Sequence, residues 1–126
     1  MVISDIEKLK LSSLGVNALI LFGSQAQGLA NSMSDYDLFV IGPKDQKVYD
    51  SVYELVSEKI NKPVDIDIVF EETSPMELQN HVAKYGKVLY QKNESIFANF
   101  KQRVMLSYSD FSVHRAIYSN ATLARI

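Results

Sequence analysis

Apolar residues along this chain follow two different spacings, which predicts alternating helices and strands. The clearest helical spacing follows Asp45, a good N-cap residue. It places on one helix face the residues Val48, Val52, Leu55, Val56 and Ile60. Mainly apolar stretches over residues 16–22 and 37–41 indicate buried strands, and the first, which contains no charged residue, is expected at the centre of a sheet.

Capping patterns mark the starts of two further helices. Ser4-Asp5-Ile6-Glu7 is a capping box, and Gly15 is expected to end that helix. Its inward stripe is predicted to be Ile3, Ile6, Leu9 and Leu14. Ser74-Pro75-Met76-Glu77 is a second capping box, and its helix should run to Tyr85 with Gly86 at the C-cap.

Weaker patterns complete the expected order of elements. A short helix should run from Ser24 or Gln25 to near Ala30, with Gly28 inside it, and strands are expected at 64–70 and 87–90. A last helix should begin near residue 94 and turn inward Ile96, Phe97, Phe100, Val104 and Met105. The fold class is therefore α/β, with a small mixed sheet of about four strands and helices packed mainly on one face.

Composition limits the function classes. The 126 residues are expected to form a single domain over 1–126, and 47% hydrophobic with 22% charged residues is typical of a soluble globular protein. A formal net charge of -2 argues against a template-handling polymerase, which needs a basic groove, so no direct nucleic-acid binding is expected. The chain has no cysteine, no recognisable signal peptide and no membrane-length apolar stretch, which fits a cytoplasmic protein.

Candidate chemistry gathers where the first strand ends and the second begins. Gly23 allows the backbone to approach a ligand, and Ser24 offers a hydroxyl and an N–H at a helix start, where anions bind. Asp35 and Asp37 point to one face of the next strand, and a divalent cation is the usual reason for two such carboxylates to stand side by side. A phosphate cradle beside a metal site indicates phosphoryl or nucleotidyl transfer.

A third carboxylate is expected on the strand at residues 64–70. Asp65 and Asp67 share one face of that strand, and either could take the proton from an attacking hydroxyl. The alternative for each is a solvated position at a sheet edge, which fits Asp65 better than Asp67.

The pattern Gly23-Ser24, ten residues, then Asp35-Tyr36-Asp37 resembles the signature of the DNA polymerase β-like nucleotidyltransferases. More narrowly, the chain resembles the minimal nucleotidyltransferase (MNT) domains that act as antitoxins to HEPN toxins. The resemblance implies that Asp67 is the third carboxylate, because it begins an apolar strand before a Pro-containing helix. It also implies two Mg²⁺ ions held by Asp35, Asp37 and Asp67, with ATP as substrate.

The resemblance further implies an activity and a partner. AMP would pass to a tyrosine of a HEPN ribonuclease toxin in a hetero-oligomer, which silences the toxin. Gly23 and Ser24 would contact the nucleotide together with Gln25 and Gln27, although family members often carry basic residues at the last two positions. The competing activities are transfer to a small antibiotic-type acceptor and binding of the toxin without turnover.

Two remaining segments give weaker indications. His81 lies in the middle of an expected helix and is interpreted as a surface residue rather than a ligand. The end of the chain, residues 108–126, mixes aromatic residues with Ser, His and Arg and lacks a dominant apolar face. It is interpreted either as a partly ordered terminus or as a docking segment for the partner protein.

Overall fold

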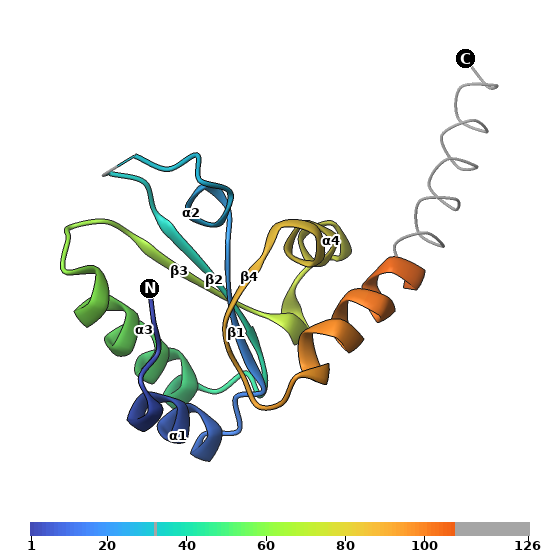
Figure 1. The fold of residues 1–126 in the computed structure, drawn as a ribbon, viewed down its shortest axis with the longest axis horizontal. Coiled ribbons are helices and arrows are strands. Elements are labelled where there is room, and N and C mark those ends of the chain that lie inside the picture. The colour runs from blue at the N-terminus through green and yellow to red at the C-terminus, as the bar shows by residue number, and fades with distance from the viewer. Residues whose placement is uncertain (32, 108–126) are drawn as a thin grey trace.

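The computed structural model describes residues 1–31 and 33–107, and Figure 1 shows their arrangement. The strands are β1 (Ala18–Phe22), β2 (Tyr36–Ile41), β3 (Ile66–Phe70) and β4 (Lys87–Gln91). The helices are α1 (Asp5–Ser13), α2 (Ser24–Gln27), α3 (Gln46–Ile60), α4 (Met76–Tyr85), the short 3₁₀ helix η1 (Glu71–Thr73) and a last helix over residues 95–107. The expected tail at 108–126 lies outside the described residues.

The four strands form one mixed sheet in the order β3-β2-β1-β4. β1 runs antiparallel to both of its neighbours, whereas β2 and β3 are parallel. Every residue of β1 is buried, as expected for a central strand without charge. The predicted α/β fold with a four-stranded mixed sheet is confirmed.

Helices cover both faces of this sheet, so the prediction that they pack mainly on one face is wrong. Because successive residues of a strand point to opposite faces, Leu19 and Leu21 pack with α1 and α3, while Ile20 and Phe22 pack with α4 and the last helix. Figure 1 shows the same division, with α1 and α3 on one side of the sheet and α4 on the other. The apolar run of β1 had allowed either arrangement, because a strand buried on both faces shows no alternation.

The first helix begins as predicted but turns a different face inward. Ser4 and Glu7 form both hydrogen bonds of the capping box. Glu7 also meets Lys59 of α3 at 2.7 Å, and this partner lowers the pKa of the Glu7 carboxyl to about 2.

Leu11 is fully buried, whereas Ile6 and Leu9 are 81% and 71% exposed, so the predicted stripe is wrong at these two positions. At 3.6 residues per turn, Ile6 and Leu9 stand about 140° and 160° away from Leu11 around the helix. The sequence offered two apolar faces, and the short connection through Gly15 into β1 places the Leu11 face against the core.

The remaining helices show where local patterns hold. All five predicted inward residues of α3 are buried, and Asp45 caps it as expected. The second capping box does not form, because the Ser74 hydroxyl donates to the carbonyl of Glu71 at 2.8 Å and Pro75 becomes the N-cap without a side-chain bond. Gly28 caps α2 in the left-handed conformation, so this helix ends at Gln27 rather than near Ala30.

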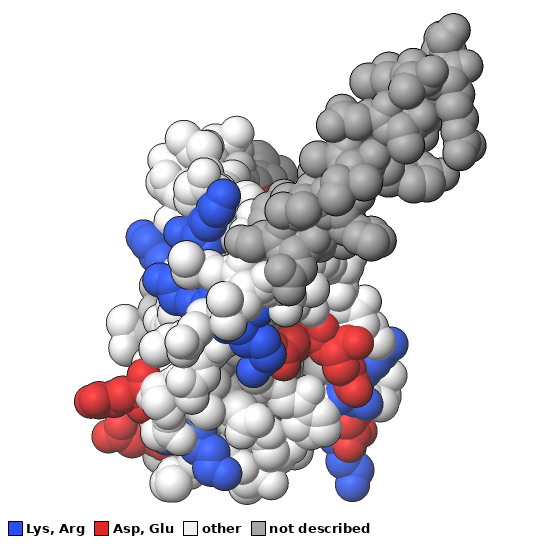
Figure 2. All heavy atoms as spheres, turned by 90° about the vertical axis from the view of Figure 1, so that its right-hand side faces the viewer, with Lys and Arg blue, Asp and Glu red and all other residues white. Residues whose placement is uncertain are grey.

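The last helix buries Phe100 and Val104 as predicted, but Met105 is 64% exposed. The face of the molecule in Figure 2 carries Lys and Arg side chains among acidic and uncharged ones, and its described part shows no continuous basic band. Within residues 1–31 and 33–107, no helix has the length and apolar content needed to cross a membrane.

The two leucines of α1 give a matched test of the corrected helix face. Leu11→Ala should lower the free energy of unfolding by about 2–5 kcal/mol, because it leaves a cavity in the core. Leu9→Ala should change it by less than about 0.5 kcal/mol, because that side chain already lies in water. Denaturant unfolding of both variants measures the difference, and equal losses would contradict the placement of α1.

Candidate active site

The turn from β1 into α2 brings the backbone against a carboxylate of β2. Gly23 lies at φ 73° and ψ -156°, a conformation that side chains other than glycine rarely adopt. A Cβ atom at this position would collide with Oδ2 of Asp37. Position 23 therefore requires glycine for two reasons: its backbone angle, and the Asp37 carboxylate that lies beside it.

Strand pairing then gathers the carboxylates. Asp37 lies opposite Phe22 of β1 in the antiparallel pair and beside Asp67 of β3 in the parallel pair. Parallel partners in register point to the same face, and Asp35, two residues before Asp37, lies on that side as well. This is the face on which α4 packs. Asp37 is half-buried, whereas Asp35 and Asp67 are exposed.

The electrostatics show that these groups interact. Burial raises the pKa of the Asp37 carboxyl, and the negative charges of Asp67 and then Asp35 raise it further. His81 of α4 acts in the opposite direction and lowers it. Asp65, the other candidate for the third carboxylate, is not among the groups that shift the pKa of Asp37. Its backbone carbonyl accepts a hydrogen bond from the backbone N–H of Tyr36 at 3.0 Å.

The donor set suits magnesium, although it does not form a closed cage. Within the described residues, no three His, Asp or Glu side chains converge closely enough to hold a metal ion unaided. Mg²⁺ in nucleotide sites commonly takes one or two carboxylates and completes its shell with substrate phosphates and water. Carboxylate oxygens of Asp35, Asp37 and Asp67, placed on one face at one end of the sheet, fit this mode of binding.

The polar residues of α2 take separate positions. Gln25 donates from its amide to the carbonyl of Ser34 at 3.2 Å and so ties α2 to the residue before Asp35. Gln27 is exposed and its Nε2 lies 3.4 Å from Nε2 of His81. Ser24 opens the helix, directly after Gly23, and its carbonyl accepts from the N–H of Leu29 at 3.0 Å.

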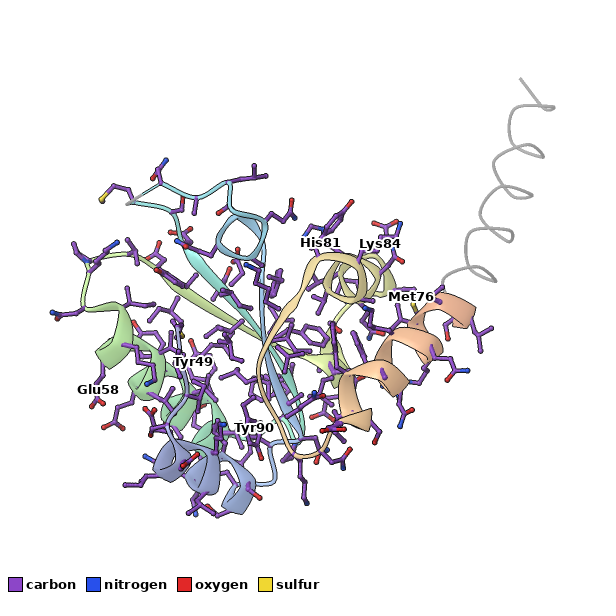
Figure 3. All side chains as sticks on the ribbon, viewed as in Figure 1. Tyr49, Glu58, Met76, His81, Lys84 and Tyr90 are labelled. Carbon is purple, nitrogen blue, oxygen red and sulfur yellow. The ribbon has the colours of Figure 1, made fainter. Side chains whose placement is uncertain are left out.

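His81 lies beside these residues, with more contacts than its interpretation as a surface residue suggested. The side chain is half-buried, and its ring packs edge-on against Phe22 at 6.2 Å and against Tyr85 at 5.1 Å. Figure 3 labels His81 on α4, where the helix comes near α2. The sequence held one signal, the His81–Tyr85 spacing of four residues, which places both rings on one helix face beside the buried Val82.

A mixed sheet with a Gly-Ser turn and carboxylates at one end of its strands is the arrangement of a nucleotidyltransferase fold. Comparison with known families gives the particular one: residues 5–95 match the family model described as "Polymerase beta, Nucleotidyltransferase". The chain belongs to this family of nucleotidyltransferases. It is 30% identical to the protein adenylyltransferase MntA of Aphanizomenon flos-aquae (strain 2012/KM1/D3), over 73% of this chain and 68% of that protein.

Solved structures support the fold. A chain in the crystal structure of a toxin–antitoxin with AMP-PNP is similar with a TM-score of 0.72 and 19% identity, covering 95% of this chain and 99% of that one. A chain in the complex of tri-AMPylated Shewanella oneidensis HEPN toxin with MNT antitoxin has a TM-score of 0.63 and 17% identity, covering 94% and 97%. The fold that the sequence resemblance implied is thereby confirmed.

The raised pKa of Asp37 predicts a stability effect of known sign. A carboxyl whose pKa is higher in the folded state than in the unfolded state destabilises the fold when ionised, and this effect disappears as the pH falls below the unfolded value. Asp37→Asn should therefore raise the unfolding temperature at pH 7 without metal, and the gain should shrink towards pH 3. A variant that is less stable than the parent at pH 7 would contradict the crowding of charges.

Proposed function

We propose that this chain is a Mg²⁺-dependent protein adenylyltransferase that moves AMP from ATP to a hydroxyl. Asp35, Asp37 and Asp67 act as the metal ligands, and Asp67 also accepts the proton of the attacking hydroxyl. Gly23 and Ser24 contact the phosphates through the backbone and the serine hydroxyl, beside Gln25 and Gln27. Family membership supports the reaction class, and the residue roles are part of the proposal.

One observation carries this assignment more than any other. Asp37 and Asp67 lie side by side on parallel strands, and Gly23, which directly follows β1, leaves room for the Asp37 carboxylate. Placing like charges together opposes folding unless a ligand uses them. The pairing supports Asp67 rather than Asp65 in this role, because the charge of Asp67, unlike that of Asp65, is among the causes that raise the pKa of Asp37.

The reaction is a single displacement at phosphorus. The hydroxyl oxygen attacks the α-phosphorus of ATP, the bond from the α-phosphorus to the bridging oxygen breaks, and pyrophosphate leaves. The hydroxyl proton passes to the Asp67 carboxylate. Bound Mg²⁺ would neutralise charge on the triphosphate, and the family resemblance implies two such ions. Positioning of the hydroxyl beside Asp67 supplies much of the rate.

The acceptor we propose is a tyrosine of a HEPN-type toxin, so that the chain acts as an antitoxin within a hetero-oligomer. The support comes from proteins similar to this chain: one is named protein adenylyltransferase MntA, and others are chains of toxin–antitoxin complexes, including one with an AMPylated HEPN toxin. A cytoplasmic location and the absence of direct nucleic-acid binding remain predictions from composition.

A second function, toxin binding without turnover, is favoured by one feature. The segment from Gly23 to Gly28 carries no basic residue that could hold a triphosphate. Transfer to a small antibiotic-type acceptor has no such feature in its favour, and among residues 1–31 and 33–107 we identify no second domain that could enclose a drug.

Intact-protein mass spectrometry separates these functions. The chain is incubated with ATP, Mg²⁺ and the product of the neighbouring gene, and we expect the partner to gain the mass of one or more AMP units. Asp37→Ala should abolish this gain. A partner that binds the chain but keeps its mass would instead establish binding without turnover.

The two aspartates near β3 give a matched pair for the same assay. Asp67→Asn should lower the transfer rate by at least about a hundredfold, because a metal ligand and proton acceptor disappear together. Asp65→Asn removes the same charge two residues earlier and should have a much smaller effect. The reverse order would contradict the assignment of Asp67.

The domain description remains a prediction, with residues 1–126 as one domain and 108–126 as its docking tail. Truncation after Ser107 should leave ATP binding and the unfolding temperature almost unchanged but weaken partner binding at least about tenfold, since the removed sequence contains apolar and aromatic residues, which favour interfaces. Titration calorimetry with ATP and with the partner measures both. Unchanged partner affinity would remove the docking role, and unfolding would assign the tail to the core.

A further inference from the structure

His81 and Gln27 approach each other from two elements that are far apart in the sequence. Nε2 of Gln27, on α2, lies 3.4 Å from Nε2 of His81, on α4. This separation is longer than the usual 2.9–3.0 Å of a nitrogen hydrogen bond. Two nitrogens can share at most one proton, so at least one N–H donor of the pair remains available to another acceptor.

The pair stands at the edge of the carboxylate site. Among the described residues, His81 is the group whose charge offsets the repulsion around Asp37. Gln27 ends the short helix that begins at Ser24. An acceptor that lies beside both side chains therefore also lies beside Asp37 and the Gly23 turn.

The order of strands places this pair opposite the acceptor side of the reaction. β3 with Asp67 flanks β2 on one side, and β1 flanks it on the other, with Phe22 opposite Asp37 and in contact with the His81 ring. In a displacement at phosphorus, the attacking and leaving oxygens lie roughly in line on opposite sides of the phosphorus. If the hydroxyl enters beside Asp67, the pyrophosphate must leave towards His81 and Gln27.

We propose that His81 and Gln27 form a phosphate-binding pair that holds the two terminal phosphates of the nucleoside triphosphate. This inference rests on the proposed transfer reaction. The imidazole and the amide each donate an N–H to phosphate oxygen, in a segment where no basic residue of α2 is available. Packing against Phe22 and Tyr85 holds the imidazole ring in place before the nucleotide binds.

The test compares ATP and AMP binding by titration calorimetry in the full chain with Mg²⁺. His81→Phe keeps an aromatic ring against Phe22 but removes the donor, and should weaken ATP binding about tenfold or more, the effect of one hydrogen bond to a charged group. AMP binding should not change, because AMP lacks the terminal phosphates. His81→Gln, which restores a donor, should recover most of the ATP affinity.

Lys84→Met is the matched control. It removes a full charge from the same helix, at a residue that lines a groove with Lys101 and Met105 whose lining includes neither His81 nor Gln27. Figure 3 labels both His81 and Lys84 on α4. The ATP affinity of the Lys84→Met variant should equal that of the parent chain. An equal loss in Lys84→Met would mean that general charge, not the pair, binds the phosphates, and would overturn the proposal.

A second variant distinguishes contact from packing. Adding Gln27→Arg to His81→Phe should restore ATP affinity, because arginine supplies donors to the same phosphates, whereas a packing defect would remain. ATP binding unchanged in His81→Phe, or equal losses for ATP and AMP, would overturn the proposal while leaving the transfer reaction intact. Failure of the parent chain to bind ATP at all would instead overturn the proposed function.

Discussion

The parallel pairing of β2 with β3 is the constraint on which the site depends. It fixes Asp37 beside Asp67 on one face of the sheet, while Leu38 and Val40 of the same strand enter the core on the other face. Burial and neighbouring charges raise the pKa of the Asp37 carboxyl, so the arrangement opposes folding at neutral pH. The buried strand β1 and the helices on both faces must offset this repulsion, and the close approach of Gly23 is possible only because that residue has no side chain.

Much of this fold follows from local patterns in the sequence. The five apolar positions of α3, the Asp45 cap and the Ser4–Glu7 capping box all form as predicted, because each depends on residues within a few positions of one another. The spacing from Gly23 to Asp37 is also local, because only a single helical turn and a loop lie between Gly23 and the strand that carries Asp37. This spacing was sufficient to suggest the family. The resemblance singled out Asp67 rather than Asp65, and the strand register places Asp67 beside Asp37.

What the sequence could not supply depends on contacts between distant elements. The inward face of α1 is decided by where Gly15 sends the chain, so Leu11 rather than Ile6 or Leu9 enters the core. The distribution of helices over both faces is decided by tertiary packing, on which a continuous apolar strand gives no information. The place of His81 beside Gln27 joins residues 54 positions apart, and no spacing rule covers that distance.

The register of β2 against β3 has a consequence for folding. Asp37 faces the candidate site, and the four residues after it are all buried, with Leu38 and Val40 on the α1–α3 side of the sheet and Phe39 and Ile41 on the α4 side. A slip of one residue against β3 would turn Asp37 towards the α1–α3 side of the sheet, and in the same step it would separate Asp37 from Asp67. A misregistered chain would therefore place a charge against apolar residues and lack the Asp37–Asp67 pair, so the register that stabilises the core also brings the carboxylates together.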